Sequence, residues 1–317
     1  MASVDLLDRK LLFVSGKGGV GKTTIAAALG LLAAQRGKRT LVCELDAKGN
    51  LADFFEAGRT TFKPRELQPG LFVMSMDAEE SLAEYLKLQL KLPVVARIGP
   101  LAKAFEFVAT AAPGVKEILT VGKPVYETHE RNWDLVVVDA VATGHITGLL
   151  SAPESINELV KVGLVRNQTG WMMETLGDPG TTGLVIVTTP EEMPVNETIE
   201  LSHRVKAETK VDLAAIVVNR VLPELFGRSE EELFERLREP AMAGRLADAA
   251  GGDPEPVLEA ARLAVTLRRT RAAHLEHLLE SIDSGVLLLY VPYLFVRSHG
   301  RRATGQVAEA LGAELGF

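Results

Sequence analysis

The feature that most constrains the fold of this chain is a glycine-rich loop near its N-terminus. Of the 317 residues, 16–23 read Gly-Lys-Gly-Gly-Val-Gly-Lys-Thr, between an apolar run over 11–15 and a helical pattern over 22–35. Because glycine lacks a Cβ, successive N–H groups can converge on one anion, and the helix N-terminus adds its dipole. The spacing and context fit the phosphate-binding loop G-x-x-x-x-G-K-[ST]. A turn that only joins a strand to a helix is the alternative.

The loop predicts a binding site for ATP and Mg²⁺. Lys22 is expected to bridge the β- and γ-phosphates as a point charge, and the Thr23 hydroxyl is expected to be a Mg²⁺ ligand. The predicted nucleotide-binding residues of this segment are Gly16, Lys17, Gly18, Gly19, Val20, Gly21, Lys22, Thr23 and Thr24.

Lys17 is unusual, because an ordinary phosphate loop needs no lysine at its second position. From within its own loop, Lys17 cannot readily share the γ-phosphate. It could instead reach across a dimer interface and supply positive charge to a neighbouring subunit, as an arginine finger does. A solvated surface lysine is the alternative, and position alone does not separate the two.

Further short apolar runs follow the first one along the chain. They cover 40–45, 135–139, 184–188, 214–219 and 286–291. Strands with near-continuous apolar sequence are buried on both faces, as in a parallel sheet covered by helices. We therefore predict a doubly wound α/β fold with a mostly parallel sheet, in which ligands bind beyond the carboxyl ends of the strands.

Two stretches with helical spacing interrupt this alternation. They cover approximately 79–126, where Leu82, Leu86 and Leu90 share a face, and 154–176. The prediction is a single domain over 1–317 with an inserted helical subdomain made of these two stretches. Another helix is predicted from Asp253-Pro254 to Ser284.

Two aspartates lie where predicted strands end. Asp46 is expected to orient or deprotonate an attacking water, although it could instead be the N-cap of the segment that starts at Asn50. Asp139 ends a valine-rich run, as the Mg²⁺-binding Walker-B carboxylate does. The following loop, 140–145, contains Thr143-Gly144 and predicts a switch that moves when the γ-phosphate leaves, with a simple turn as the alternative. The predicted Mg²⁺ ligands are Thr23, Asp46 and Asp139.

Several segments, in chain order, resemble the ArsA family, which includes the targeting ATPase for tail-anchored membrane proteins. The chain looks like a bacterial member, and the resemblance covers nearly its whole length. In the first-switch segment, alanine replaces the family's proline, and Lys-Gly replaces Ala-His. The matching segments are KGGVGKTT (17–24), LDAKGNLADFF (45–55), DAVATGHITGLL (139–150), TTPEEMPVNETIEL (188–201), VVNRVLP (217–223) and VPYLFVR (291–297).

The resemblance implies roles for particular residues. Lys17 would act on the neighbouring subunit, Asp46 would orient the water, Asp139 would be the second-switch aspartate, and Asn219 and Pro292 would flank adenine. It also implies a dimeric ATP-driven switch, either a homodimer or a heterodimer with a related chain, that binds a hydrophobic client or a membrane partner. A positioning ATPase of the MinD/ParA kind and an ATPase subunit of an anion or arsenite transporter are the alternatives.

Composition narrows these possibilities. The single cysteine, Cys43, excludes an intrachain disulfide, a Cys-x-x-Cys zinc clip within the chain and a metalloid site built of several thiolates. The net charge of −7 argues against a nucleic-acid partner. We expect a cytoplasmic protein without a transmembrane segment, whose membrane role, if any, is peripheral, because no apolar stretch approaches the roughly 18–20 residues that span a bilayer.

Overall fold

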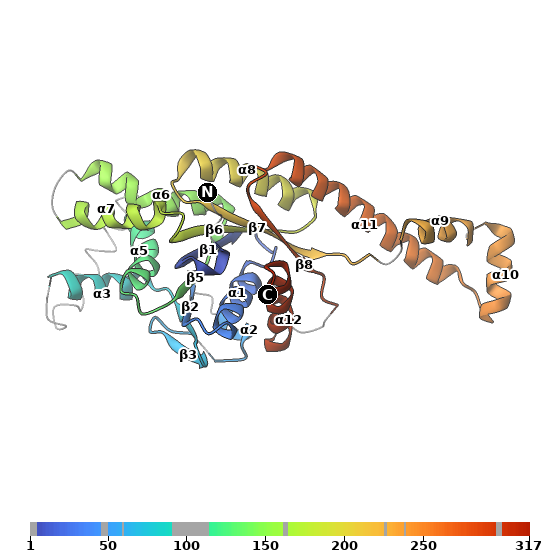
Figure 1. Cartoon of the computed structure of the whole chain (residues 1–317), viewed down its shortest axis with the longest axis horizontal. Coiled ribbons are helices and arrows are strands. Elements are labelled where there is room, and N and C mark those ends of the chain that lie inside the picture. The colour runs from blue at the N-terminus through green and yellow to red at the C-terminus, as the bar shows by residue number, and fades with distance from the viewer. Residues whose placement is uncertain are drawn as a thin grey trace.

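The computed structural model describes residues 5–45, 50–58, 60–90, 114–160, 164–224, 227–237, 239–295 and 300–317. Its centre is an eight-stranded sheet with the order β3-β4-β2-β5-β1-β6-β7-β8 (Figure 1). Neighbouring strands are parallel except for β3 and β4, which are antiparallel. The strands are β1 (Leu11–Gly16), β2 (Thr40–Glu44), β3 (Arg65–Gln68), β4 (Leu71–Ser75), β5 (Leu135–Ala142), β6 (Thr182–Thr188), β7 (Leu213–Val221) and β8 (Leu287–Pro292).

The predicted mostly parallel α/β fold is confirmed, and each apolar run forms a strand. The sequence did not predict β3 and β4. β3 is an edge strand that contains Arg65 and Glu66, so it lacks the apolar run that marked the others. β4 is a buried five-residue strand, and its pairing with β2 places it inside the sheet.

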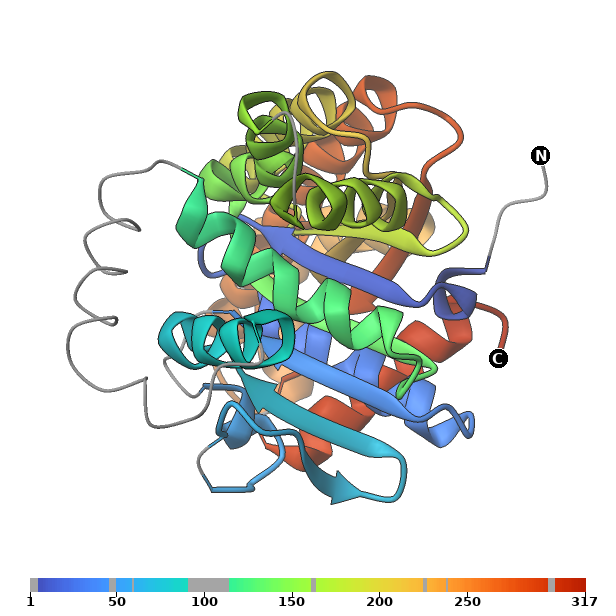
Figure 2. The same ribbon diagram turned by 90° about the vertical axis from the view of Figure 1, so that its left-hand side faces the viewer.

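Helices cover both faces of the sheet, and the alternation of side chains along β1 explains why. Leu12 and Val14 point into one apolar cluster, and Leu11 and Phe13 point into the other. Figure 2 shows α3 and α5 in front of the strands, and α1 and α12 behind them. The helices are α1 (Lys22–Gln35), α2 (Asn50–Phe54), α3 (Ala78–Leu90), α5 (Val115–His129), α6 (Thr143–Leu159), α7 (Leu164–Gly177), α8 (Glu192–Glu208), α9 (Arg228–Leu237), α10 (Pro240–Ala250), α11 (Glu255–Ser281) and α12 (Arg301–Glu314).

The stretches predicted to form a helical subdomain are helical over their described residues, except at Gly114 and Val160. Helices α3 and α5 come from the first stretch, and α6 and α7 from the second. Within this group α5 packs against α3, α6 and α7, and α6 packs against α7. Helix α6 begins directly after β5, eleven residues before the predicted start at 154. Residues 91–113 and 161–163 lie outside the described part of the chain.

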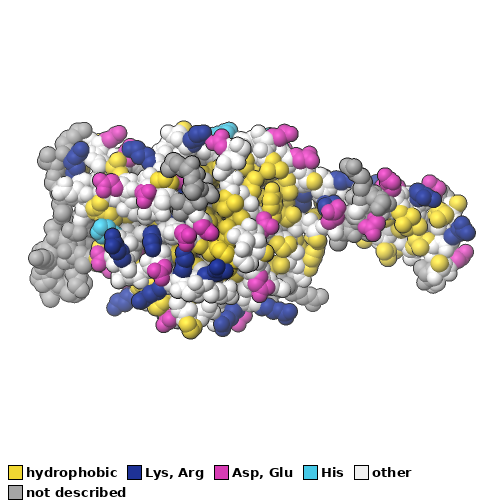
Figure 3. Space-filling view, in the orientation of Figure 1, with side chains coloured by type: hydrophobic (Ala, Val, Ile, Leu, Met, Phe, Trp, Pro, Cys, Tyr) yellow, Lys and Arg dark blue, Asp and Glu magenta, His cyan; other side chains and the backbone are white. Residues whose placement is uncertain are grey.

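A second group of helices extends from the β8 side of the sheet, and we call residues 228–267 the arm (Figure 1). The predicted long helix is α11, which ends three residues before Ser284. Helix α11 packs against α8, at its later half (Figure 1). In the arm, Val257, Leu263 and Leu267 are 71%, 60% and 44% exposed, and Figure 3 shows apolar side chains along it. Among the described helices, none combines the length and the hydrophobicity that crossing a bilayer requires.

Candidate functional site

The glycine-rich loop joins β1 to α1 at the carboxyl edge of the sheet, and its backbone requires glycine. Gly16, Gly19 and Gly21 have φ angles of 150°, 86° and 98°. A Cβ at Gly16 would lie 2.1 Å from the carbonyl oxygen of Val187, and one at Gly21 would lie 2.4 Å from Nδ2 of Asn219. No side chain caps the N-terminus of α1 at Gly21. The first-turn N–H groups of α1 therefore remain suited to an anion.

The side chains in and after the loop also have defined positions. Lys22 lies back over the loop, because its Nζ donates to the carbonyl oxygen of Lys17 at 3.1 Å. Val20 is buried, and Thr23 and Thr24 are half-buried in the first turn of α1. The geometry fits a phosphate chain, because a Cβ added at Gly18 or Gly19 would meet nothing within 4 Å, so these two glycines border open space.

Asn219 of β7 lies behind the loop and is buried. Its Nδ2 donates to the carbonyl oxygen of Val20 at 2.8 Å, so it braces the loop. Its Oδ1 accepts a hydrogen bond from the backbone N–H of Arg220, a non-glycine residue with φ +61°. Two residues further, Val221 pairs with Pro292 of β8. The structure therefore brings Asn219 and Pro292 to the same edge of the sheet as the loop.

Asp139 is buried in β5, next to the same edge. It is paired in register with Val14 of β1 and with Glu44 of β2. In-register side chains of parallel strands share a face, about 4.8 Å apart, so the two carboxylates lie beside each other on the α1 side. Glu44 is 2% exposed and was not predicted. The acidic residue that closes the apolar run Thr-Leu-Val-Cys-Glu was the signal for it.

The prediction of a loop over residues 140–145 is wrong. Strand β5 continues through Asp139 to Ala142, and α6 starts at Thr143 without a loop. The extension is possible because Gly16 pairs with Ala142 beyond a bulge in β1 and because Ser15 Oγ donates to the carbonyl oxygen of Val141 at 2.8 Å. Gly144 therefore lies in the first turn of a helix.

Lys17 forms an ion pair within its own chain. Its Nζ contacts Oε1 of Glu197 on α8, and the two side chains are 28% and 31% exposed. Oε2 of the same glutamate accepts a hydrogen bond from Thr143 Oγ1 at 3.2 Å. Glu197 was not predicted, since it lies 180 residues from Lys17 along the chain. Lys17 thus has a defined partner and is not a fully solvated lysine.

Two further predictions concern Asp46 and Cys43. Asp46 lies outside the described residues. Cys43 is buried, and burial, followed by the nearby charge of Glu127, raises the pKa of its thiol well above the ordinary range. A thiol held neutral in this way is a poor metal ligand. Within the described ranges, no group of three or more His, Cys, Asp and Glu side chains is placed to hold a metal ion.

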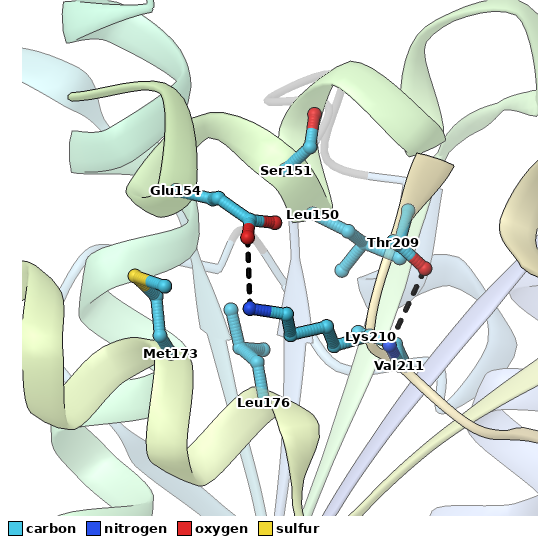
Figure 4. Close-up of a pocket in the computed structure, with 8 residues that line it drawn as sticks. All are labelled: Leu150, Ser151, Glu154, Met173, Leu176, Thr209, Lys210 and Val211. Atoms are coloured by element: carbon cyan, nitrogen blue, oxygen red, sulfur yellow. Dashed lines mark hydrogen bonds and ion pairs between the residues drawn. The ribbon is translucent and has the colours of Figure 1, made fainter. Parts of the chain in front are cut away.

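A shallow hollow lies away from the phosphate loop (Figure 4). Lys210 reaches Glu154 across it, with Nζ and Oε1 2.8 Å apart. Thr209 and Val211, which precede β7, form one wall, and Leu150, Met173 and Leu176 of α6 and α7 form the other. The hollow is thus at the amino end of β7, whereas the phosphate loop is at the carboxyl edge. It is not part of the candidate site.

Comparison with known proteins agrees with this geometry. The model of a family described as anion-transporting ATPase, ArsA, matches residues 9–176 and 164–239. The ATPase BagA of Mycobacterium tuberculosis is 31% identical over 226 residues, which are 68% of this chain and 66% of that protein. An ATPase ASNA1 homolog of Entamoeba dispar is 27% identical over 253 residues, covering 68% of this chain and 77% of that protein. The match spans a little under two thirds of the length of the mycobacterial relative. Because the family model matches more than half of the residues of this chain, the chain belongs to the ArsA family.

Proposed function

We propose that this chain hydrolyses ATP and acts as a dimeric switch, in which ATP brings two subunits together and Lys17 of each completes the site of the other. The partner would be a second copy or a related chain. The observation that carries the proposal is the direction of Lys17. Although it belongs to the phosphate loop, its ammonium group pairs with Glu197 on α8, while Lys22 lies over the loop. A cation held away from its own loop by a partly exposed ion pair can be released to a neighbouring subunit.

The residues at the carboxyl edge suggest how each site would work. The loop amides and Lys22 would hold the phosphates, and Asn219 and Pro292 would lie next to adenine. Thr23, Asp46 and Asp139 would hold Mg²⁺, which neutralises phosphate charge when bound. Asp46 would also orient the attacking water, and Lys17 from the partner would stabilise the charge that develops on the transferred phosphoryl group.

The test uses Lys17→Ala and Asp46→Asn. Each variant is expected to lower turnover by about 10³-fold or more, since a cation supplied in trans accelerates phosphoryl transfer by about 10³–10⁵-fold. Binding of a fluorescent ATP analogue should persist in both. Hydrolysis at the wild-type rate by both variants would reject the mechanism.

We further propose that the nucleotide state controls a partner-binding surface on α3 and α5–α7. The support is their position: α6 begins directly after the strand that holds Asp139, so a change at the nucleotide can reach these helices. The partner would be a hydrophobic client or a membrane protein, reached from the cytoplasm. Crosslinking and capture with Asp46→Asn and ATP should enrich such a partner over the same experiment with ADP.

The family description favours one second candidate, an ATPase subunit of an anion or arsenite pump. The single buried Cys43 does not provide the soft ligands that arsenite requires. We therefore expect the ATPase rate to be unchanged by arsenite. A several-fold stimulation would favour the pump instead.

A further inference from the structure

We propose that Glu197 is a positioning residue that retains Lys17 in its own subunit and releases it when the start of α6 moves. The inference rests on the proposed dimeric function. It starts from the two oxygens of one carboxylate: Oε1 pairs with Lys17 in the phosphate loop, and Oε2 accepts a hydrogen bond from Thr143 at 3.2 Å. Glu197 therefore connects the lysine to the first residue of α6.

Helix α8 fixes the position of Glu197 through its buried face. Pro194, Val195, Thr198 and Leu201 are buried, and α8 packs against β1, β6 and β7, which fixes this part of the helix. Two turns after Glu197, Arg204 donates to Thr147 Oγ1 at 2.8 Å. Helices α8 and α6 are thus joined at two levels, one helical turn apart on α6. A movement of the start of α6 therefore changes the hydrogen bond between Thr143 and Glu197 before the one between Thr147 and Arg204.

The exposure of the ion pair makes it reversible. Both side chains are about 30% exposed, and exposed or partly exposed ion pairs are weak enough to be exchanged. The phosphates of a nucleotide bound to a partner carry more negative charge than one carboxylate. When they approach, Lys17 can leave Glu197 for the stronger anion. Glu197 then sets the threshold at which the dimer closes.

Thr143 couples the nucleotide site to the ion pair between Glu197 and Lys17. It follows β5, which contains Asp139, with no intervening loop. Displacement at Asp139 is therefore passed along the strand to Thr143 and to Oε2 of Glu197. Lys17 and the start of α6 at Thr143 would respond together, because both contact the carboxylate of Glu197.

The test is Glu197→Gln, which keeps the shape and the hydrogen bond to Thr143 but removes the charge. The ATPase rate per subunit is measured against protein concentration. We expect the half-maximal concentration to fall about two- to fivefold, the range of a weak ion pair, with a plateau rate within about twofold of wild type. The matched control is Glu200→Gln, an exposed residue one turn later on the same helix, which should leave both values unchanged.

Two measurements show whether the effect passes through Lys17. Without nucleotide, an acylating reagent should modify Lys17 about two- to fivefold faster in Glu197→Gln, as quantified by mass spectrometry. In a Lys17→Ala background, Glu197→Gln should not change ATP-dependent dimerisation measured by light scattering. An unshifted half-maximal concentration, or an equal shift without Lys17, would overturn the role of Glu197. A wild-type rate per subunit that does not depend on protein concentration would instead reject the dimeric function itself.

Discussion

Lys17 and Lys123 each pair with glutamate, and their surroundings differ. Lys17 is at the carboxyl edge of the sheet, its side chain is 28% exposed, and it pairs with Glu197. Lys123 of α5 is 5% exposed and lies between Glu84 and Glu127, at 2.5 and 2.7 Å. A charge in a low-dielectric interior must stay paired, because the penalty for breaking the pair is several kcal/mol, whereas a partly exposed pair can be exchanged at little cost. Burial thus separates a structural ion pair from one that is available for function.

The surroundings of Lys123 strengthen this contrast. Trp133 Nε1 donates to Oε2 of Glu127 at 2.7 Å, and the ammonium group of Lys123 is 5.0 Å from the centre of the Phe62 ring. Burial alone would lower the pKa of Lys123, but hydrogen bonds and charges from Glu127 and Glu84 outweigh it and raise the pKa. The network connects α3 and α5 to Phe62, which precedes β3, and to Trp133, which precedes β5.

The largest effect on stability is expected from Lys123→Met. The change leaves the buried Glu127 without its cation, which should lower the free energy of unfolding by about 3–5 kcal/mol. Urea unfolding at pH 7 measures it. Lys17→Ala is the matched comparison and should change stability by less than about 1 kcal/mol. Equal losses in the two variants would remove the distinction between the pairs.

A smaller effect should separate the two partners of Lys123. Glu127→Gln is expected to cost about 2 kcal/mol, because this side chain is 10% exposed and also accepts from Trp133. Glu84→Gln should cost less than about 1 kcal/mol, since its side chain is 34% exposed. Thermal unfolding of both variants checks the order, and the reverse order would show that burial does not decide the strength of these pairs.

The smallest effect concerns alkaline pH. The folded pKa of Lys123 is raised above its unfolded value, so its contribution is complete below about pH 10.4 and is lost as the pH rises through the folded pKa. The difference in unfolding free energy between wild type and Lys123→Met should therefore shrink above that pH. Urea unfolding from pH 8 to 11 measures it. A difference that grew with pH would contradict the sign of the pKa shift.

Sequence alone predicted the parts of the fold that depend on local pattern. The apolar runs became strands because both faces of the central strands are buried, and α1 covers the predicted residues. The charged edge strand β3 and the two short helices of the arm have no comparable signal. The end of β5 was also missed, because its extension to Ala142 depends on pairing with Gly16, more than a hundred residues away.

In the candidate site, too, the contiguous motif could be predicted from the sequence, whereas contacts between distant elements could not. The glycine loop is a contiguous motif, and the contacts of Gly16 with Val187 and of Gly21 with Asn219 give each glycine a steric reason. Glu197 could not be selected from sequence, since it matters only through a neighbour on another element. An isolated acidic residue is usually solvated, and only the fold shows which carboxylate meets Lys17.

The most direct test of the central claim mixes two inactive variants, Lys17→Ala and Asp46→Asn, at a protein concentration that saturates dimerisation. If Lys17 acts on its neighbour, a mixed dimer contains one complete site, formed by Asp46 of one subunit and Lys17 of the other. Random pairing then gives about a quarter of the wild-type ATPase rate in an equimolar mixture. A mixture no more active than either variant alone would contradict the claim.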